Sequence, residues 1–392
     1  MKLFPLAAVT FAWPLRAAAA AASLSGAQAD FVQLYGAIDL GYVHDSGVPA
    51  AGDTGARTVW GLASGQGTAS MIGVRGRHVL RSGLGIAFVA ETGFCPAGIN
   101  QRGVDPNDPS QHYCSGAGWM QREAHLGLHG PAGTLSAGLH PTLLALREGE
   151  VDAFEGGYAG GVGNISLISN NRPGLGLSRL AQSLAYTSPS LRGATVSAQY
   201  GFNTGRDALP RWADAPLPRA WLLDVKRADG PWLAGVSHAH YLDYRYALPG
   251  DPHHVHGGYR IWMGYARYDF GRVRGDAIVQ RNVADDSSGA QTVWSLGLVW
   301  KQGAAAWMAS VGQHASSMAP RSHPLGVSRA WQYAVGWRYA WSRRTELHTS
   351  YAMVRNAAQD ATHAGTRLAP APTGAVIGAV ARGFECGLTY RF

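Results

Sequence analysis

Two clusters of metal-ligating side chains are the residues of this sequence best suited to chemistry. Three imidazoles that could bind a transition metal lie close together, at His253, His254 and His256. Oxygen ligands of the kind that Ca²⁺ prefers lie at Asp105, Asn107 and Asp108. Both clusters lie in polar stretches, and a solvated loop or an ordinary turn explains each of them without a metal. We therefore expect no metal site and no cofactor.

The cysteines predict one disulfide and one unreactive thiol. Cys95 and Cys114 bracket a polar stretch rich in Pro, Asn and Asp, and in an oxidising compartment such a pair can close its loop. The alternative is two unrelated thiols. Cys386 lies in an alternating stretch near the C-terminus, where we expect it to serve as a small apolar residue.

The N-terminus has the features of a signal peptide. Lys2 gives a short positive region, an apolar stretch and an alanine run follow, and Ala27-Gln28-Ala29 is an A-x-A cleavage site. We therefore expect residues 1–29 to be removed and residues 30–392 to form the mature domain. A disordered or weakly helical N-terminus is the alternative.

The composition favours a membrane protein built from strands. Charged residues make up 15% of the 392 residues, below the usual quarter of soluble domains. The 52 Gly, 13 Trp and 16 Tyr suit a barrel with tight turns and aromatic girdles. Mean hydropathy is −0.09, and beyond the N-terminus no stretch approaches the roughly 20 apolar residues of a spanning helix.

The net charge of +8 does not indicate a nucleic-acid partner. The arginines are spread singly along the chain, and neither a basic run nor a DNA-binding motif is present. A weak attraction for anions or for the phosphates of lipopolysaccharide is the more plausible consequence of this charge.

Strict alternation of apolar and polar residues is the main structural signal. At the C-terminus, Phe384, Cys386, Leu388, Tyr390 and Phe392 share one face. Residues 329–341 repeat the pattern, with Trp and Tyr at the strand ends on the apolar face. Soluble sandwiches alternate too, but aromatic residues at strand ends are typical of barrels whose apolar face meets lipid.

The pattern predicts an all-β fold, a transmembrane antiparallel β-barrel of about sixteen strands. Short turns alternate with long connections, as in outer-membrane barrels. The expected strands are residues 31–44, 70–77, 84–94, 119–129, 134–140, 180–188, 194–203, 219–228, 232–244, 257–269, 273–283, 291–301, 305–315, 329–341, 345–353 and 384–392.

Short motifs in a fixed order resemble the general porins of β-proteobacteria, the Neisseria, Bordetella and Burkholderia type. Each motif is weak alone, but their order covers the mature chain from end to end. The motifs are Leu34–Asp39, Ile72–Gly76, Arg122–Leu128, Ala185–Pro189, Trp341–Thr345 and Gly387–Phe392.

This resemblance implies a general diffusion porin, a homotrimer in the outer membrane with lipid and lipopolysaccharide around it. It also implies that the barrel assembly machinery reads the terminal Phe392. In the family the third extracellular loop folds inward and narrows the pore. The matching segment runs from about residue 143 to 179 and carries the candidate constriction acids Glu148, Glu150, Asp152 and Glu155.

The wall opposite these acids is expected to be basic. By parity along their strands, Arg75, Arg77, Arg274 and Arg338 face the lumen. Acids on one side and arginines on the other would set a transverse field that tunes ion selectivity. The net charge favours anions and the acidic loop favours cations, so the selectivity stays open.

Besides a general porin, the sequence leaves three alternative functions, which are a substrate-specific channel, a soluble glycan-binding β protein and a barrel lipase. A substrate-specific channel with a row of solute-binding residues is the closer alternative. A barrel lipase would need a lipid-facing Ser with a His partner, and the outward parity offers no such pair, so we expect no enzyme.

Overall fold

The computed structural model describes eleven segments of the chain. They are residues 30–49, 56–80, 83–97, 120, 122–166, 178–202, 219–246, 255–285, 290–316, 329–356 and 380–392. The expected signal peptide, the histidine cluster at 253–254 and most of the 95–114 loop lie outside these residues.

Strands make up most of the described chain, with one short α-helix between β6 and β7. The strands are β1 (Phe31–Pro49), β2 (Ala56–Ser64), β3 (Met71–Val79), β4 (Gly85–Gly93), β5 (Glu123–Gly130), β6 (Gly133–Pro141), β7 (Arg179–Thr187), β8 (Ala194–Gly201), β9 (Arg219–Asp229), β10 (Trp232–Tyr246), β11 (Val255–Asp269), β12 (Val273–Ala284), β13 (Ala290–Gln302), β14 (Ala305–Ser316), β15 (Arg329–Ala340), β16 (Thr345–Asn356) and β17 (Val380–Arg391). The helix is α1 (Leu143–Val151), and a 3-10 turn, η4 (Val162–Asn164), follows it.

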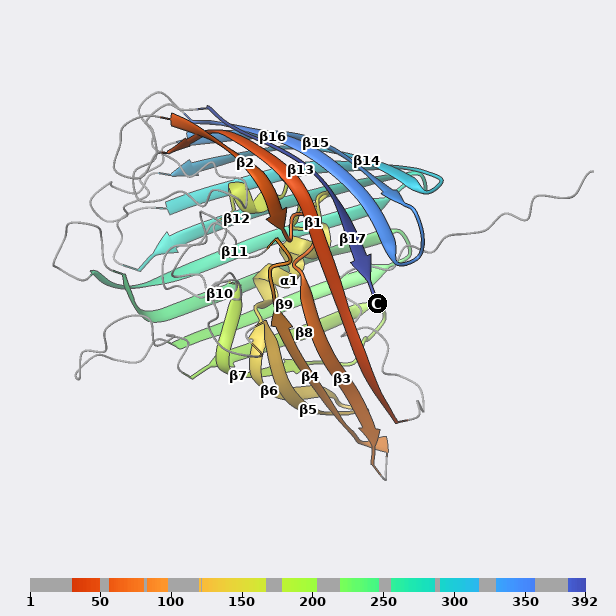
Figure 1. Ribbon diagram of the computed structural model, residues 1–392. Helices are drawn as coiled ribbons and strands as arrows, with labels where there is room; N and C mark the ends of the chain where they lie inside the picture. Colours follow the sequence, from red (N-terminus) through yellow and green to blue (C-terminus); the bar gives the residue numbers. More distant parts are fainter. Residues whose placement is uncertain are drawn as a thin grey trace, which may run out of the picture.

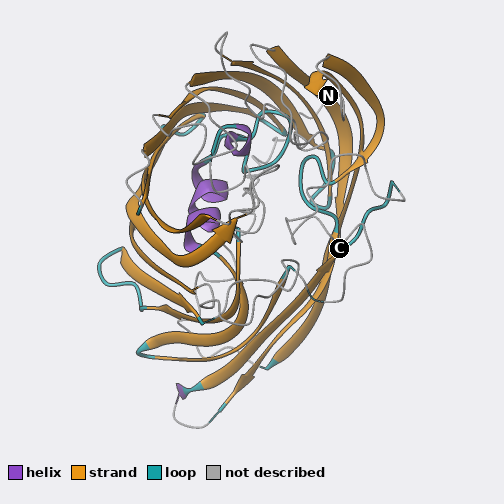
Figure 2. Ribbon diagram, turned by 90° about the vertical axis from the view of Figure 1, so that its left-hand side faces the viewer, coloured by secondary structure: helices purple, strands orange, loops and turns teal. Residues whose placement is uncertain are grey.

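These strands close into an antiparallel barrel of sixteen strand positions (Figures 1 and 2). Apart from β2 and β3, each strand pairs with its neighbour in sequence, and β1 closes the ring by pairing with β17. The second half of β1 pairs with β2, and its first half pairs with β3. Because β2 and β3 lie end to end along one edge of β1, the two strands fill a single position.

The expected number of strands is confirmed, but the expected start of the second strand position was wrong. The second strand position begins at Ala56 and is interrupted at residues 65–70, whereas the sequence pattern predicted a strand only from residue 70. Glycines at 61, 65 and 67 and the small Ala63 and Ser64 hide the alternation of β2.

The two faces of the wall differ as the alternation requires. Outward residues are apolar and exposed, for example Leu34 at 58% and Trp60 at 69%. Inward neighbours such as Asp39 and Glu385 are buried, at 0% and 1%. Among the described residues, no helix is long and apolar enough to cross a membrane.

The helix α1 lies inside the ring of strands (Figure 2). It contacts β8 to β12, and its Leu143, Leu144 and Val151 are buried in one apolar cluster with side chains of the wall. We call the described residues 142–166, which include α1 and the turns after it, the inner loop.

Candidate functional site

The helix of the inner loop is fixed to the wall at its first turn. Thr142 caps it, accepting a hydrogen bond from the Ala145 amide at 3.2 Å. Gln199 of β8 accepts from the Leu143 amide at 3.0 Å and donates to the Pro141 carbonyl at 2.8 Å. The Gln199 side chain therefore binds the backbone on both sides of Thr142, where β6 passes into α1.

A buried network of charges fixes the middle of α1. Arg147 donates to Asp224 of β9 at 2.9 Å and to Glu150, one turn along the helix, at 2.8 Å. Lys226 of β9 lies 3.2 Å from the same Glu150 carboxylate. Asp224 also accepts from Ser237 at 2.6 Å, so that its charge is well solvated by protein donors.

Two further acids of the inner loop are used within the protein. Glu148, 1% exposed, accepts from Gln280 of β12 at 2.8 Å and also from Ser166. Asp152, 3% exposed, accepts from the Gly156 and Val162 amides at 2.9 and 3.2 Å. Together with Glu150, these acids are buried between loop and wall and add no charge to an open surface.

The turn after α1 adopts an unusual backbone and is bound by two arginines. Glu155, Gly156 and Tyr158 have φ values of 54°, 65° and 57°, in the left-handed region that side chains disfavour. Arg338 of β15 donates to the Glu155 carboxylate at 2.7 Å. Arg274 of β12 donates to the Asp152 carbonyl at 3.4 Å. These contacts compensate for the cost of the conformation.

The tip of the inner loop binds two separate parts of the wall. The Tyr158 hydroxyl donates to Glu346 of β16 at 2.8 Å, and the Ala159 amide donates to the Ser350 hydroxyl at 2.9 Å. On its other side, the Tyr158 amide donates to the Gln66 carbonyl. Gln66 belongs to residues 65–70, which leave the sheet between β2 and β3 and which we call the wall bend.

Asp39 of β1 fixes the wall bend. Its carboxylate accepts from the amides of Gln66, Gly67 and Thr68 at 2.8, 3.1 and 3.1 Å. Ser70 and the Asp39 backbone exchange two further hydrogen bonds of 2.9 and 3.1 Å. One buried carboxylate thus replaces the sheet partners that the bend has lost.

Close backbone contact joins the wall bend to the inner loop. A Cβ atom on Gly157 would lie 2.5 Å from the Gly67 carbonyl, a distance that no side chain tolerates. A Cβ atom on Gly67 would lie 2.9 Å from both Asp39 and Tyr158. Glycine is therefore required on both sides of this contact.

A histidine connects the same network to β16 and β17. His348 is fully buried and lies 3.3 Å from Asp39 and 2.8 Å from Glu385. Glu385 also accepts from Ser350 at 2.7 Å, and Ser350 binds the loop tip. The wall bend, the loop tip and the closing strands therefore share one polar network.

The inner faces of β3 to β5 carry a second, more open group of charges. Arg75 donates to Gln33 at 2.8 and 2.9 Å and lies 5.1 Å from the centre of the Tyr35 ring. Arg122 donates to Glu91 at 2.6 Å, and Tyr35 donates to the same carboxylate at 3.0 Å. Glu123 of β5 pairs directly with Glu91 across the strands and lies 2.7 Å from His125. The group therefore contains two arginines and two acids.

All four arginines chosen by parity lie on the inner face. Arg274 and Arg338 bind the inner loop, Arg75 lies on the more open wall, and Arg77 lies 3.4 Å from His129. The four candidate acids lie in the inner loop, and only Glu155 is not fully buried.

The sequence patterns missed several residues of this site. By parity with Ala124 and Leu126, Arg122 would point outward, but this arginine lies just before β5, where strand parity does not apply, and it binds Glu91. Asp39 and the wall bend were also missed. The run Gly65-Gln66-Gly67 inside a strand region was the available signal, since glycines there indicate a bulge or a close backbone contact.

The structure describes two of the three cysteines. Cys95 is disulfide-bonded, and Cys386 is a free, exposed thiol on the outward face of β17. Cys114 lies outside the described residues, so its pairing with Cys95 stays a prediction.

Comparisons with known proteins point in one direction. A family model described as Gram-negative porin matches residues 15–359, whereas no curated protein matches the sequence significantly. Similar solved structures include an anion-selective porin from Comamonas acidovorans (18% identity, TM-score 0.70, 93% of this chain and 100% of that chain). Others are the trimer form of OmpT, an outer membrane protein of Vibrio cholerae (13%, 0.61, 93% and 100%), and OmpF of Salmonella typhi in complex with daunomycin (12%, 0.56, 92% and 97%).

The contact between Gly67 and Gly157 gives a first prediction. Gly157→Ala should push the loop tip off the wall bend and release the hydrogen bond from the Tyr158 amide. Hydrogen exchange at that amide should then rise about tenfold, the equivalent of about 1.4 kcal/mol. Gly149→Ala is the matched control, because its nearest neighbour outside the helix lies 3.8 Å away. Unchanged protection of Tyr158 in Gly157→Ala would contradict the assignment.

Asp152 gives a second prediction, on pH. Burial, with Glu148 close by, raises the pKa of this loop carboxyl to about 7, against the opposing hydrogen bonds from Gly156 and Val162. The folded chain therefore binds the proton more tightly than the unfolded chain, and stability falls as pH rises from about 4 to about 7. Asp152→Asn keeps a hydrogen-bond acceptor but loses the titrating carboxyl. The denaturation midpoint of this variant should therefore depend less on pH across this range. An equal slope in both proteins would exclude this role for Asp152.

Proposed function

Because this chain belongs to the Gram-negative porin family, we propose that it is a general diffusion channel whose width is set by the fixed inner loop. As a porin it is a channel for passive diffusion in the outer membrane. Family and fold point to a channel rather than an enzyme. Ions and small hydrophilic solutes are the proposed cargo, and a substrate-specific channel is the alternative.

The binding of the inner loop along most of the inner wall is the observation that supports this proposal. Its fastening points follow one another from Gln199 on β8 through Asp224 and Gln280 to Ser350 on β16. A loop fixed at this many points narrows the barrel without closing and opening. Passage is then governed by size and charge, as in a permanently open pore.

The charges that remain on open surfaces support a preference for anions. The acids Glu148, Glu150 and Asp152 are buried, and Glu155 is paired with Arg338. Arg75, by contrast, is half-buried and pairs with a neutral amide. The Comamonas structure is that of an anion-selective porin, and we propose the same preference here from this chain's own residues.

Planar-bilayer recording tests both parts of the proposal. We expect a conductance that grows with salt without saturating and a reversal potential that favours chloride over potassium. Arg75→Gln should lower the anion-to-cation permeability ratio about twofold, since a unit charge about 8 Å away in water contributes about 0.5 kcal/mol. Arg227→Gln, an exposed outward residue, is the control. Saturation by a single sugar or amino acid would instead support the substrate-specific channel.

We further propose a homotrimer that packs through the outer faces of β3 to β6. A solved relative is in a trimer form. These four strands are short, at 8 or 9 residues, and contain neither Trp nor Tyr. Without the Trp and Tyr residues typical of a lipid interface, their outward Ile, Leu and Val side chains suit a neighbouring protein better than a lipid boundary.

Substitution of one leucine tests this interface. Leu126 of β5 and Leu298 of β13 are similarly exposed, at 59% and 56%, but only Leu126 lies on the proposed face. Leu126→Gln should raise the proportion of monomer in native mass spectrometry about tenfold, because it places an unpaired amide in an apolar contact. Leu298→Gln should leave the trimer intact. A larger proportion of monomer in Leu298→Gln than in Leu126→Gln would place the interface elsewhere.

Three earlier expectations remain proposals. Residues 1–29 act as the signal peptide, lipopolysaccharide contacts the outer surface, and Phe392 is read by the assembly machinery. The position of Phe392 suits that role, since it is 40% exposed and exchanges two 3.2 Å backbone hydrogen bonds with Gly36 of β1.

A further inference from the structure

The outward surface carries a group of arginines where three neighbouring strands reach the outer side. Arg329 of β15, Arg355 of β16 and Arg382 of β17 are exposed and have outward parity. Pairing places Arg355 opposite Val380, so Arg355 and Arg382 are diagonal neighbours, about 7–8 Å apart. Arg329 is the diagonal neighbour of Arg355 on the other side. The three therefore form one cationic cluster.

No carboxylate of these strands shares that surface. Their acids, Glu346 and Glu385, are 4% and 1% exposed and lie on the inner face. Within the described part of the chain, Arg355 and Arg382 make no ion pair. Two guanidinium groups are thus available to an anion from outside the protein.

The height of the cluster matches the outer boundary of the membrane. Short turns such as residues 341–344 mark the periplasmic side, and the arginines lie at the opposite ends of the strands. From Phe392 to Arg382 the chain runs ten residues, about 33 Å. At the usual tilt this is about 25 Å across the membrane, the height of the apolar band.

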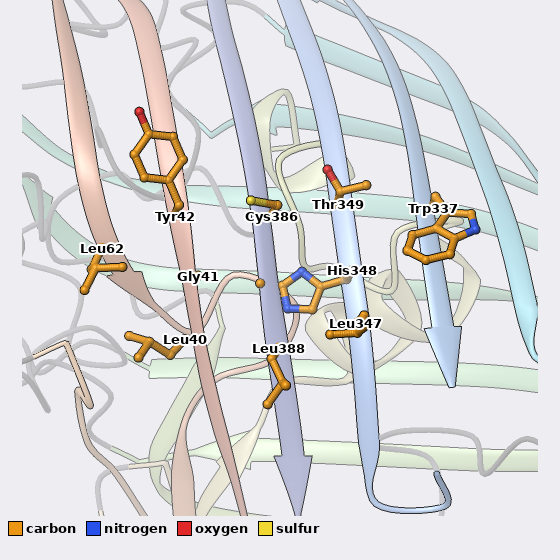
Figure 3. Close-up of a pocket in the computed structure, with 11 residues that line it drawn as sticks. Leu40, Gly41, Tyr42, Leu62, Trp337, Leu347, His348, Thr349, Cys386 and Leu388 are labelled. Atoms are coloured by element: carbon orange, nitrogen blue, oxygen red, sulfur yellow. The ribbon is translucent and has the colours of Figure 1, made fainter. Parts of the chain in front are cut away.

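Below the cluster, β1 and β2 together with β15 to β17 form an apolar furrow of about 640 Å³ (Figure 3). One row of directly paired outward residues crosses it, with the small Thr349 and Cys386 in the middle. Tyr42 lies beside Cys386, and Trp337 lies beside Thr349. The large rings on both sides and the small residues between them give the furrow its shape.

We propose that the furrow and the cluster together bind one phosphorylated lipid of the outer leaflet. Its phosphate lies on Arg355 and Arg382, whose planar guanidinium groups suit phosphate oxygens. An acyl chain lies in the furrow beside Cys386, four residues or about 13 Å further into the membrane. The cationic cluster favours this occupant over a second copy of the chain, because a copy packed through the same strands would bring no exposed carboxylate from them to the arginines. The site is independent of what passes through the pore.

The thiol of Cys386 reports directly on occupancy of the furrow. The full chain, refolded in detergent without native lipid, is treated with N-ethylmaleimide, and mass spectrometry follows the peptide that contains Cys386. Bisphosphorylated lipid A should slow labelling about tenfold, whereas phosphatidylcholine or inorganic phosphate at equal concentration should not. The double variant Arg355→Ala, Arg382→Ala should need about tenfold more lipid A for the same protection.

The control variant is Arg281→Ala, which removes an exposed outward arginine at the outer end of β12, away from the furrow. It should behave as the unaltered chain does. The proposed site would be overturned if Arg281→Ala weakened the protection of Cys386 by lipid A as much as the double variant does. Equal protection of Cys386 by phosphatidylcholine, or protection by inorganic phosphate alone, would overturn it too. Slow labelling without any lipid that speeds up when the oligomer dissociates would place a second copy in the furrow. If the double variant does not refold, the three ligand experiments on the unaltered chain still decide.

Discussion

The pairing of every backbone polar group in the wall is the constraint on which this structure depends. In a membrane no water replaces a lost hydrogen bond, so a break in a strand must be repaired within the protein. Between β2 and β3 the chain turns inward, and the Asp39 carboxylate accepts three of its amides. The same bend then receives the Tyr158 amide of the inner loop. Repair of the wall and positioning of the loop are therefore one network.

The inner loop makes part of the inner wall apolar. A barrel interior is ordinarily polar, but Leu222, Tyr241, Ile261 and Met263 are inward, apolar and buried, because they share a cluster with α1. The buried pair of Arg147 and Asp224 also joins α1 to β9. Removal of one partner of such a pair costs about 3–5 kcal/mol. Apolar packing and buried charge together make the loop part of the rigid wall.

Sequence alone could predict the strands, their faces and the closing position of Phe392, since each follows from alternation. It could not predict which inward residues are covered. Glu385 and Thr389 have the parity of lumen residues, and both are on the inner face, yet they are buried under the wall bend network. Parity gives the direction of a side chain, whereas burial depends on which distant segment packs on it. For the same reason β2 was missed, because its identity depends on pairing with β1.

The same difference between the direction and the burial of a side chain decides how the charges of the inner loop act on ions. In the sequence, the four acids of the inner loop favour cations, whereas the net positive charge favours anions. The sequence alone therefore does not give the ion selectivity. Counted in the fold, Glu148, Glu150 and Asp152 are used to fix the loop, and each is matched by donors within the protein. A charge that is desolvated and paired acts on a passing ion far less than one that faces water. The proposed anion preference therefore rests on the arginines left facing solvent, Arg75 first among them, and not on the net charge of the chain.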